Sequence, residues 1–549
     1  MSNHVRLILV MSLALGLGLH AAHAQTPLKT IKKGSVSGKI TIKGKAASTI
    51  LVSVRPSDFS SPFETSYRAV TDLQGLYRVT DIPPGSYQVI AVVPAYIATN
   101  DNSRGKTVVI GDGENVDGID FSLIRGGVIT GKVTDADGRP VIEQRVSLVQ
   151  GELSTEQRLQ LGPLNSATTD DRGIYRMFGL RAGRYKVSVG QGSEAFFGGI
   201  ASGRPTYKLT YHPDVNDYSK ATIVEVTEGS ESTNVDISLG RVAQTFAVNG
   251  RVISGENSEP IAGVRFGLRM ITGSRGGAFI SSPNLSDAKG QFLIEHLTPG
   301  KYAVFILPTA NSPLRADPIQ FEILDRDVND IVVTTSKGAS LTGVVVLENT
   351  DNQSIVARLM KLQVQGYVQS ETPGGNIGHS SPINGDGSFQ LTGLEVGSLY
   401  FSLGPFSDAE ARKTFNLIRI ERDGVVQPRG VEIKKGEQIS GVRLVIAYGS
   451  GVLRGTVTLQ NGTLPAGGRI SLRLTKLNEA NSALRPPTID ERGHFLIDGL
   501  PVGAYEIAAF VFVPGARTAT PITKQQITIS DESTTEVLLT IDLAQKPEQ

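Results

Sequence analysis

Residues 71–89 read TDLQGLYRVTDIPPGSYQV and contain the pattern that decides the fold. An Asp stands three residues before a Gly, an aromatic residue follows the Gly by two positions, and a second Gly follows the first by ten. The pattern recurs four more times, which predicts one small unit used five times. The paired glycines are Gly75 and Gly85, Gly173 and Gly183, Gly290 and Gly300, Gly387 and Gly397, and Gly493 and Gly503.

Apolar residues alternate on both sides of the turn between these glycines. In the first copy they are Tyr77, Val79, Ile82, Tyr87 and Val89. A period of two places alternate side chains on one face, so the pattern predicts two strands that contribute to one core. The intervening residues are often polar, as expected where the other face meets water; examples are Gln88, Lys186 and Glu506.

The first Gly of each copy is expected to adopt a positive φ, which Gly does without steric penalty. The Asp before it can accept hydrogen bonds from its own turn. The fourth copy has Asn384 at this position. Asn can make the same turn but cannot replace an acid as a metal ligand or proton carrier, so a structural role is favoured.

Each unit is predicted to open with a Gly that enters a strand and to end on a closing strand. The opening glycines are Gly38, Gly131, Gly250, Gly343 and Gly455. Units of about 100 residues with several short strands are typical of an antiparallel β-sandwich. The connections between units are short, which predicts a semi-rigid string of domains. The predicted fold class is therefore all-β, with five tandem antiparallel sandwiches.

The chain is predicted to consist of a signal peptide at 1–24, a linker at 25–34, β-sandwiches at 35–124, 125–242, 243–337, 338–447 and 448–543, and a tail at 544–549. The signal peptide is predicted from Arg6, the apolar run 7–19 and the cleavage pattern at 22–24. The second unit contains a long aromatic insertion and the fourth is the most divergent. An extracytoplasmic location is expected: periplasm, outer surface or secreted.

Composition removes several classes of site. The chain has no Cys, which excludes disulfides, thiolate metal sites and a lipid-modified N-terminal Cys. The formal net charge is +1, so no overall field favours nucleic acid. No apolar stretch after the signal peptide is long enough for a transmembrane helix.

The stretches 71–89, 169–187 and 490–507 resemble the carboxypeptidase regulatory-like domain, a transthyretin-like (prealbumin-like) sandwich grouped with carbohydrate-binding-like folds. The third unit keeps the pattern, while the fourth departs most, with Asn384, Val396 and Leu399. The resemblance implies tandem accessory domains of a secreted bacterial protein. It also implies glycan binding, or service beside an envelope peptidase or transporter, as functions of such domains.

The insertion of the second unit contains the candidate ligand-binding residues Tyr207, Tyr211, His212 and Tyr218. Aromatic residues in a Gly- and Pro-rich loop can form a stacking surface for sugars or an interface. The alternative, favoured by the alternation of Tyr207, Leu209 and Tyr211, is an added strand that packs inward. The absence of Trp also weighs against sugar binding.

Other motifs favour structural explanations. The four His residues that follow the predicted signal peptide lie in four separate units, without the close Glu spacing of a zinc peptidase; these are His212, His296, His379 and His494. Asp135-x-Asp137-Gly138 begins like a calcium loop, but Val146 stands where its Glu is needed. Lys39 with Asn115 and Lys132 with Asn234 could be cross-linking pairs, yet exposed strand lysines are the better explanation.

These observations predict a non-catalytic, extracytoplasmic binding or scaffold protein at the bacterial cell surface or envelope. The expected partner is an envelope protein or a glycan, with no cofactor, no metal and no nucleic acid. The alternatives are a carbohydrate-binding protein, or an accessory subunit of an envelope peptidase or transporter.

Overall fold

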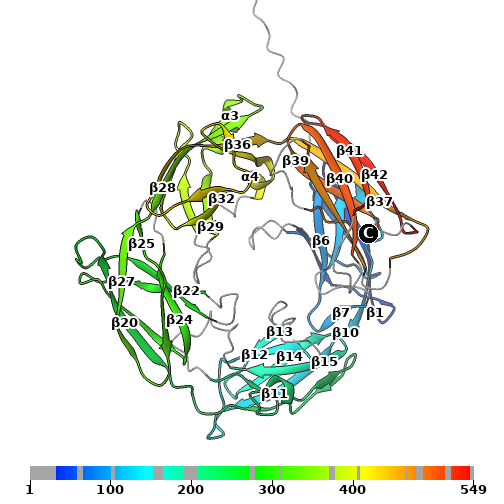
Figure 1. Ribbon diagram of the computed structural model, residues 1–549. Helices are drawn as coiled ribbons and strands as arrows, with labels where there is room; N and C mark the ends of the chain where they lie inside the picture. The colour runs from blue at the N-terminus through cyan, green and yellow to red at the C-terminus, as the bar shows by residue number, and fades with distance from the viewer. Residues whose placement is uncertain are drawn as a thin grey trace, which may run out of the picture.

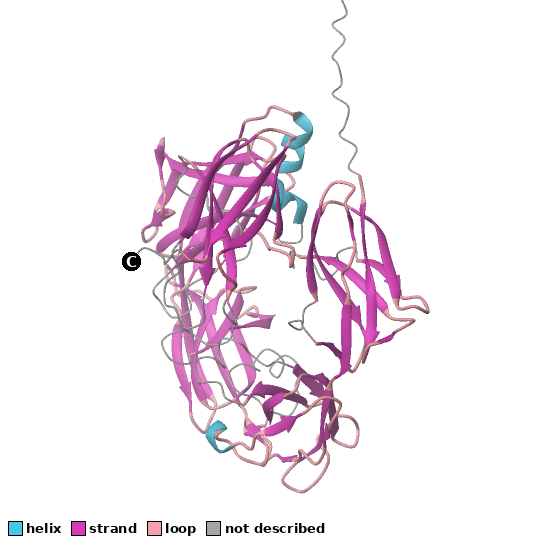
Figure 2. Ribbon diagram, turned by 90° about the vertical axis from the view of Figure 1, so that its right-hand side faces the viewer, coloured by secondary structure: helices cyan, strands magenta, loops and turns pink. Residues whose placement is uncertain are grey.

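The computed structural model describes residues 32–57, 66–99, 105–151, 165–190, 207–271, 279–307, 312–369, 378–404, 409–464, 468–477, 486–512 and 521–544. The predicted signal peptide, most of the linker and residues 545–549 lie outside these ranges. The fold is all-β, as predicted (Figure 2). The described helices are short: α3 (Gln353–Leu359), α4 (Ala409–Thr414) and the 3-10 turn η1 (Tyr218–Lys220).

Two packed sheets surround each large hydrophobic core. We name them the opening sheet, which contains the strand that begins the unit, and the facing sheet. In unit 1 the opening sheet contains β1 (Gly34–Ile42), β2 (Lys45–Ala46), β5 (Leu76–Ile82), β7 (Tyr96–Ala98), β9 (Asn115–Val116) and β10 (Phe121–Arg125). Its facing sheet contains β3 (Leu51–Pro56), β4 (Tyr67–Val70), β6 (Gly85–Val92) and β8 (Lys106–Ile110).

Units 2 and 3 repeat this plan. The opening sheet of unit 2 contains β11 (Gly127–Thr134), β14 (Ile174–Leu180), β18 (Glu231–Ser232) and β19 (Ile237–Ser238). Its facing sheet contains β12 (Arg145–Gln150), β13 (Asn165–Thr168), β15 (Gly183–Val189), β16 (Thr210–Tyr211) and β17 (Val224–Val226). The opening sheet of unit 3 contains β20 (Phe246–Ser254), β23 (Gln291–Leu297), β25 (Leu314–Arg315) and β27 (Val328–Lys337). Its facing sheet contains β21 (Arg265–Met270), β22 (Phe279–Leu285), β24 (Gly300–Ile306) and β26 (Ile319–Ile323).

Units 4 and 5 follow in the same way. The opening sheet of unit 4 contains β28 (Ala339–Glu348), β31 (Ser388–Leu394), β33 (Phe415–Arg422), β34 (Val425–Val426) and β36 (Gln438–Tyr448). Its facing sheet contains β29 (Gln363–Gln369), β30 (Gly378–Pro382), β32 (Gly397–Gly404) and β35 (Val431–Ile433). The opening sheet of unit 5 contains β37 (Gly451–Gln460), β39 (His494–Leu500) and β42 (Thr534–Asp542). Its facing sheet contains β38 (Arg469–Lys476), β40 (Gly503–Phe512) and β41 (Pro521–Ile529). The residue boundaries between units stay predictions.

The strand pairs are antiparallel except those that join the first strand of a unit to strands near the end of that unit, which the sequence pattern did not specify; in units 1 and 2 these parallel pairs include β1 with β9 and β11 with β18 and β19. β1 runs parallel to β10, β20 to β27, β28 to β36 and β37 to β42. A parallel neighbour requires a crossover connection. Here the chain crosses through the facing sheet before it returns, so each unit is closed by its last strand.

The repeated motif carries the chain from the opening sheet to the facing sheet. Its first strand pairs with the opening strand, as β5 does with β1, and its second strand joins the facing sheet, as β6 does beside β3. The predicted inward residues are buried in the core. In four units the Tyr after the second Gly donates its hydroxyl to a carbonyl four residues earlier, at 2.6–2.9 Å; these are Tyr87, Tyr185, Tyr302 and Tyr505. Leu399 fills this position in unit 4 and is also buried.

The structure explains why each opening strand contains a Gly. A Cβ on Gly455 would lie 2.3 Å from the ring of Phe495, and one on Gly131 would lie 2.0 Å from the carbonyl oxygen of Val235. The motif aromatic ring and the segment leading to the closing strand therefore occupy the space of the missing side chain. The Asp turns also match the prediction: the Oδ1 atom of Asp72 accepts from the N–H groups of Gln74 and Leu76, beside Gly75 at φ +75°.

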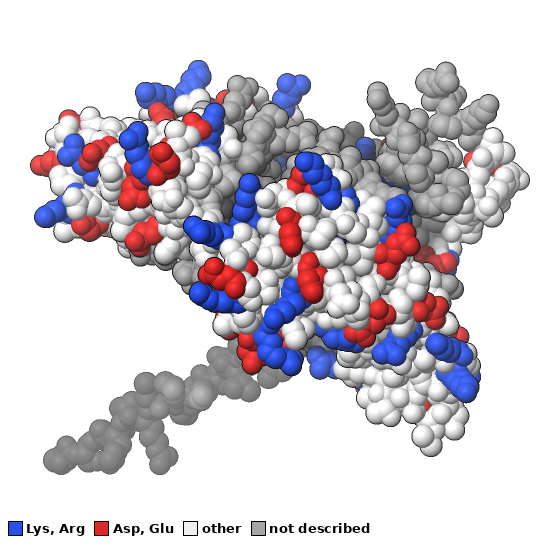
Figure 3. Space-filling view, turned by 90° about the horizontal axis from the view of Figure 1, so that it is seen from below, with Lys and Arg blue, Asp and Glu red and all other residues white. Residues whose placement is uncertain are grey.

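The five units are arranged around a ring, with the first beside the fifth (Figure 1). In the third and fourth units, the facing strands β22, β24, β29 and β32 lie toward the middle of the ring and β20, β27, β28 and β36 lie outside (Figure 1). Charged side chains of both signs are interspersed on the face seen in Figure 3, in keeping with the near-zero net charge.

Candidate functional site

The predicted aromatic site of unit 2 is largely internal. Tyr207 and Tyr211 are 7% and 6% exposed, and Tyr211 lies in β16, which pairs with β15. The inward-packing alternative therefore describes these two residues. The half-buried Tyr218 packs edge-on against Tyr211 and lies 4.0 Å from the Nζ atom of Lys186. Nδ1 of His212 hydrogen-bonds the Asp236 carbonyl oxygen at 2.7 Å. Ligand binding by these four residues stays a prediction, and only His212 and Tyr218 retain substantial exposure.

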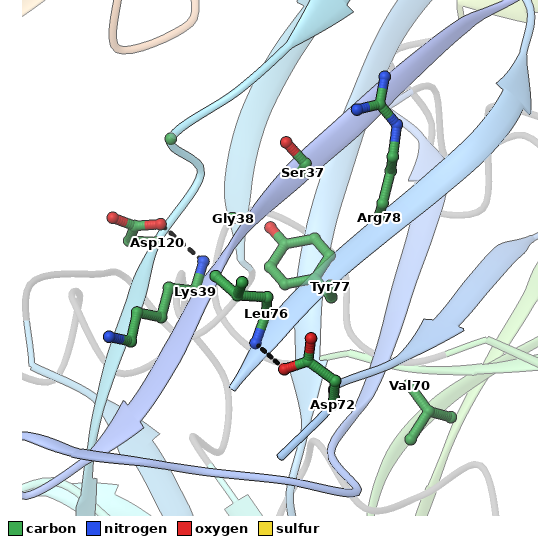
Figure 4. A pocket seen from close by; sticks show the side chains of 10 residues that line it. Ser37, Gly38, Lys39, Val70, Asp72, Leu76, Tyr77, Arg78 and Asp120 are labelled. Carbon is green, nitrogen blue, oxygen red and sulfur yellow. Dashed lines mark hydrogen bonds between the residues drawn. The ribbon is translucent and has the colours of Figure 1, made fainter. Parts of the chain in front are cut away.

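An open hollow of about 660 Å³ lies on unit 1 (Figure 4). Its polar groups serve the fold: Asp72 accepts from the Leu76 N–H, and Asp120 accepts from the Lys39 N–H at 2.7 Å. The hydroxyl of Tyr77 donates to the Ile119 carbonyl at 2.6 Å, and burial raises the pKa of this side chain. The hollow is the outer side of the motif turn, and no group aimed at a ligand distinguishes it.

The other candidate motifs also have structural partners. Oδ1 of Asp135 accepts from the N–H groups of Asp137 and Arg139, both at 2.9 Å, as in a hairpin turn. His379 lies buried beside Glu395, at 3.2 Å between Nε2 and Oε2. Within the described ranges, no three His, Asp or Glu residues are grouped as a metal site would need.

The contact between units 1 and 5 is a polar interface that sequence analysis missed. Strand β8 is the edge of its sheet, and its outward-facing Val109 is fully buried although its neighbours Val108 and Ile110 belong to the core. The Val109 N–H donates to Oδ2 of Asp490 at 3.1 Å, and its carbonyl accepts from Nη2 of Arg492 at 2.6 Å. The motif turn of unit 5 therefore caps an open sheet edge of unit 1.

Charges on both units support this contact. Glu114 of unit 1 accepts from Nη1 of Arg492 at 3.1 Å and from Nη2 of Arg454 at 2.7 Å. Lys106 pairs with Glu491 at 3.1 Å. The carboxylate of Asp490 is 1% exposed and is held by Arg492 at 2.8 Å as well as by the amides of its own turn. The buried carboxylate of Asp490 thus has several partners, as a buried charge requires, while the other charged groups of the contact are partly exposed.

Arg454 is the residue in the sequence that could have predicted the contact between units 1 and 5. It stands one residue before the opening Gly, where the other units have a neutral polar residue; those residues are Ser37, Thr130, Asn249 and Thr342. A single charged residue at a repeated position marks a function that the other copies lack. Glu114 and Val109 have no comparable signal, because nothing in their local sequence indicates contact with a segment about 380 residues away.

Three of the four joints between consecutive units are built on a pair of glycines. Before the opening strand, Gly126, Gly338 and Gly449 each donate their N–H to a carbonyl of the preceding unit, at 2.8–2.9 Å. Each packs against a motif Gly with φ near +70°; these are Gly179, Gly393 and Gly499. A Cβ on Gly499 would lie 2.2 Å from the Lys413 carbonyl oxygen. A Cβ on Gly126, Gly338 or Gly449 would lie 2.0–2.6 Å from the backbone of the motif glycine, so these three positions have no room for a side chain, which restricts the angle between neighbours.

The joint between units 2 and 3 differs. Thr245 and His296 occupy the positions of the two glycines, and the described residues show no corresponding bond between the units. In units 1, 3 and 4 the segment after the second motif strand contacts the next unit. In unit 2 this part of the chain instead returns to β15 as β16. The described part of the aromatic insertion, from Tyr207 on, therefore packs on its own unit.

No described helix has the length and apolar character needed to cross a membrane. No protein-family model matches the chain, and no curated protein matches it. Among solved structures, a streptococcal ancillary pilin matches at 14% identity and TM-score 0.25, over 56% of this chain and 99% of the pilin. The minor pilin GBS52 of Streptococcus agalactiae matches at 13% and 0.23, over 38% of this chain and 95% of that pilin. Scores this low carry no argument, so the tandem β-sandwich architecture rests on the chain's own sheets and cores.

Proposed function

We propose that the protein is a non-catalytic, extracytoplasmic scaffold or binding protein of the bacterial envelope, built from carboxypeptidase regulatory-like units held as a closed ring. The observation that carries the proposal is the contact of Asp490 and Arg492 with the edge strand β8. A chain that only displayed independent domains would have no need to join its first and last units. Closure through the buried carboxylate of Asp490 and the partly exposed ion pairs around it favours a fixed arrangement of five surfaces over a flexible tether.

Because the chain has no Cys, introduced Cys residues are its only thiols and can each be labelled specifically to test this proposal. Lys45→Cys in unit 1 and Thr534→Cys in unit 5 place one label on each unit at exposed positions. Pulsed electron paramagnetic resonance on the doubly labelled chain is expected to give one narrow distance distribution. A broad distribution at low ionic strength would contradict the closed ring. Turnover of a peptide or polysaccharide panel by the purified chain would contradict the non-catalytic assignment.

Glycan binding is a second candidate function, favoured by an exposed aromatic pair on unit 4.

A further inference from the structure

The facing sheet of unit 4 exposes two stacked tyrosines. Tyr367 on β29 and Tyr400 on β32 lie opposite each other in register, with ring centroids 5.4 Å apart and planes inclined by 18°. Tyr367 is 47% exposed and Tyr400 is half-buried. Both point away from the core, because their neighbours Val368 and Leu399 belong to it. The rings therefore stack on each other, and the pair presents its ring edges and the outer face of each ring to the surroundings.

The same position in the other units provides an internal comparison. Each unit has one cross-strand pair at this place on the facing sheet; the other four pairs are Arg55–Gln88, Val149–Lys186, Arg269–Ala303 and Thr475–Glu506. Each of these contains a charged side chain, whereas unit 4 has only tyrosines. The charge is exposed at Arg55 and partly exposed at Glu506, whereas Lys186 is buried, so the shared feature of the other four pairs is a charged side chain and not a common degree of exposure. The presence of two aromatic rings in place of a charged side chain in unit 4 indicates a different function for this surface.

Outward aromatic residues on the facing sheets of units 3 and 5 are paired with cations. Arg469 lies 5.1 Å from the ring centroid of Phe512, and the corresponding distances are 4.9 Å for Arg473 and Phe510 and 6.0 Å for Arg269 and Phe305. Such cations occupy the negative face of the ring. Among the described contacts, the Tyr367–Tyr400 pair has no such cation. The two ring faces are left for another group that carries partial positive charge on its surface.

Amide and hydroxyl side chains surround the pair, together with one carboxylate, Glu432, which accepts a hydrogen bond from the Ser398 hydroxyl. The outward residues next to the tyrosines along the two strands are Gln365, Gln369, Ser398 and Ser402. On the β30 side Tyr367 lies opposite Gly378, which adds no side chain beside the ring. Gln amides and Ser hydroxyls both donate and accept hydrogen bonds. Glu432, opposite Ser398, is the nearest charged residue in the described sheet register.

We propose that Tyr367 and Tyr400 form a stacking platform for a neutral polysaccharide. The C–H face of a pyranose ring carries partial positive charge and packs on the negative face of an aromatic ring. The hydroxyl groups around the sugar match the Gln and Ser side chains beside the tyrosines. A small number of polar groups beside an aromatic surface is the usual composition of a ligand site. The strands that carry the platform, β29 and β32, lie toward the middle of the ring (Figure 1).

The test is affinity electrophoresis and calorimetric titration of the full mature chain with neutral oligosaccharides: hexamers of cellulose, xylan, chitin and laminarin. Saturable binding of one neutral glycan is expected. Tyr367→Ala and Tyr400→Ala should each weaken it at least tenfold, while Tyr367→Phe and Tyr400→Phe, which keep the rings, should stay within about threefold. Phe512→Ala in unit 5 is the matched control and should bind like the native chain.

Thermal melting of each variant separates loss of binding from loss of folding, and the Phe variants keep the test valid if an Ala variant unfolds. Unchanged binding in the Tyr367→Ala/Tyr400→Ala double variant would overturn the proposal, as would the absence of saturable binding to every neutral glycan. Binding only to anionic polysaccharides would overturn it too, since the platform has no cation. The proposal does not depend on the closed ring, so the label-distance experiment can fail while glycan binding stands.

Discussion

Asp490 accepts a hydrogen bond from the backbone N–H of Val109 at 3.1 Å, across 381 residues of sequence. The same carboxylate holds its own turn through the Arg492 and His494 N–H groups. One side chain therefore performs two separable tasks on its two oxygens. Asp72, the equivalent residue of unit 1, performs the turn task in its own motif. This pair of residues gives a matched comparison between local and long-range roles.

Asp490→Asn is expected to open the ring, whereas Asp72→Asn is expected to be nearly neutral. An Asn retains one carbonyl oxygen for the turn, but its amide presents a donor to the Val109 N–H and to Arg492. Hydrogen bonds to charged groups contribute about 1.5–3 kcal/mol each. The measurement is the label distance between residues 45 and 534 in both variants. Equal distances in the two variants would contradict the assigned role of Asp490.

Gly499→Ala is expected to loosen the joint between units 4 and 5. A Cβ there lies 2.2 Å from the Lys413 carbonyl oxygen, in addition to the backbone cost of φ +71°. Gly424→Ala is the control, because Gly424 has φ +79° and open space around it. The control isolates the left-handed penalty of about 1–2 kcal/mol. Hydrogen exchange in α4 and β39 should increase only in Gly499→Ala; an equal increase in both variants would mean that the joint is not sterically fixed.

The joint between units 2 and 3 is expected to be the most open of the joints. Arg125, Arg241 and Lys337 are exposed and lie at the first, second and third joints, so trypsin can report on each. Cleavage requires local opening of the backbone. We expect cleavage after Arg241 to come first in a time course of limited proteolysis, with the fragments identified by mass spectrometry. The Arg241→Gln variant should lose this early cleavage. Earlier cleavage after Arg125 or Lys337 would show that the glycine joints are the weaker ones.

The repeated motif predicted the all-β class, the inward residues and the turn role of Asp, because each depends on neighbours within about twenty residues. The parallel closing strands and the ring depend on contacts between distant segments, and these have no local signature. Helix α3 was also missed, although Asn352 caps it by accepting from the Ser354 N–H. Tyr400 could have been found, since it is an aromatic residue at the position where Gln88, Lys186 and Glu506 indicated an outward face. Its partner Tyr367 required the strand register.

The ion-pair network of unit 4 predicts a pH-dependent stability. Arg419 donates to Glu348 at 2.8 Å and to Glu421 at 2.6 Å. The hydrogen bond from Arg419 lowers the pKa of Glu348 in the folded chain. A lowered carboxyl pKa contributes stability above the unfolded value of about 4.3, and this contribution disappears as pH falls through the folded pKa.

Glu348→Gln is therefore expected to destabilise unit 4 at pH 7 and to have no effect once both pKa values are passed on acidification. The pair is partly exposed, so the loss should be about 0.5 kcal/mol. Urea unfolding mapped by proteolysis of unit 4, at pH 7 and at acidic pH, measures the difference. Asp351→Asn, at an exposed position of the same unit, is the control for loss of one negative charge. A deficit in Glu348→Gln that persisted in acid would mean that Glu348 acts through packing and not through its charge.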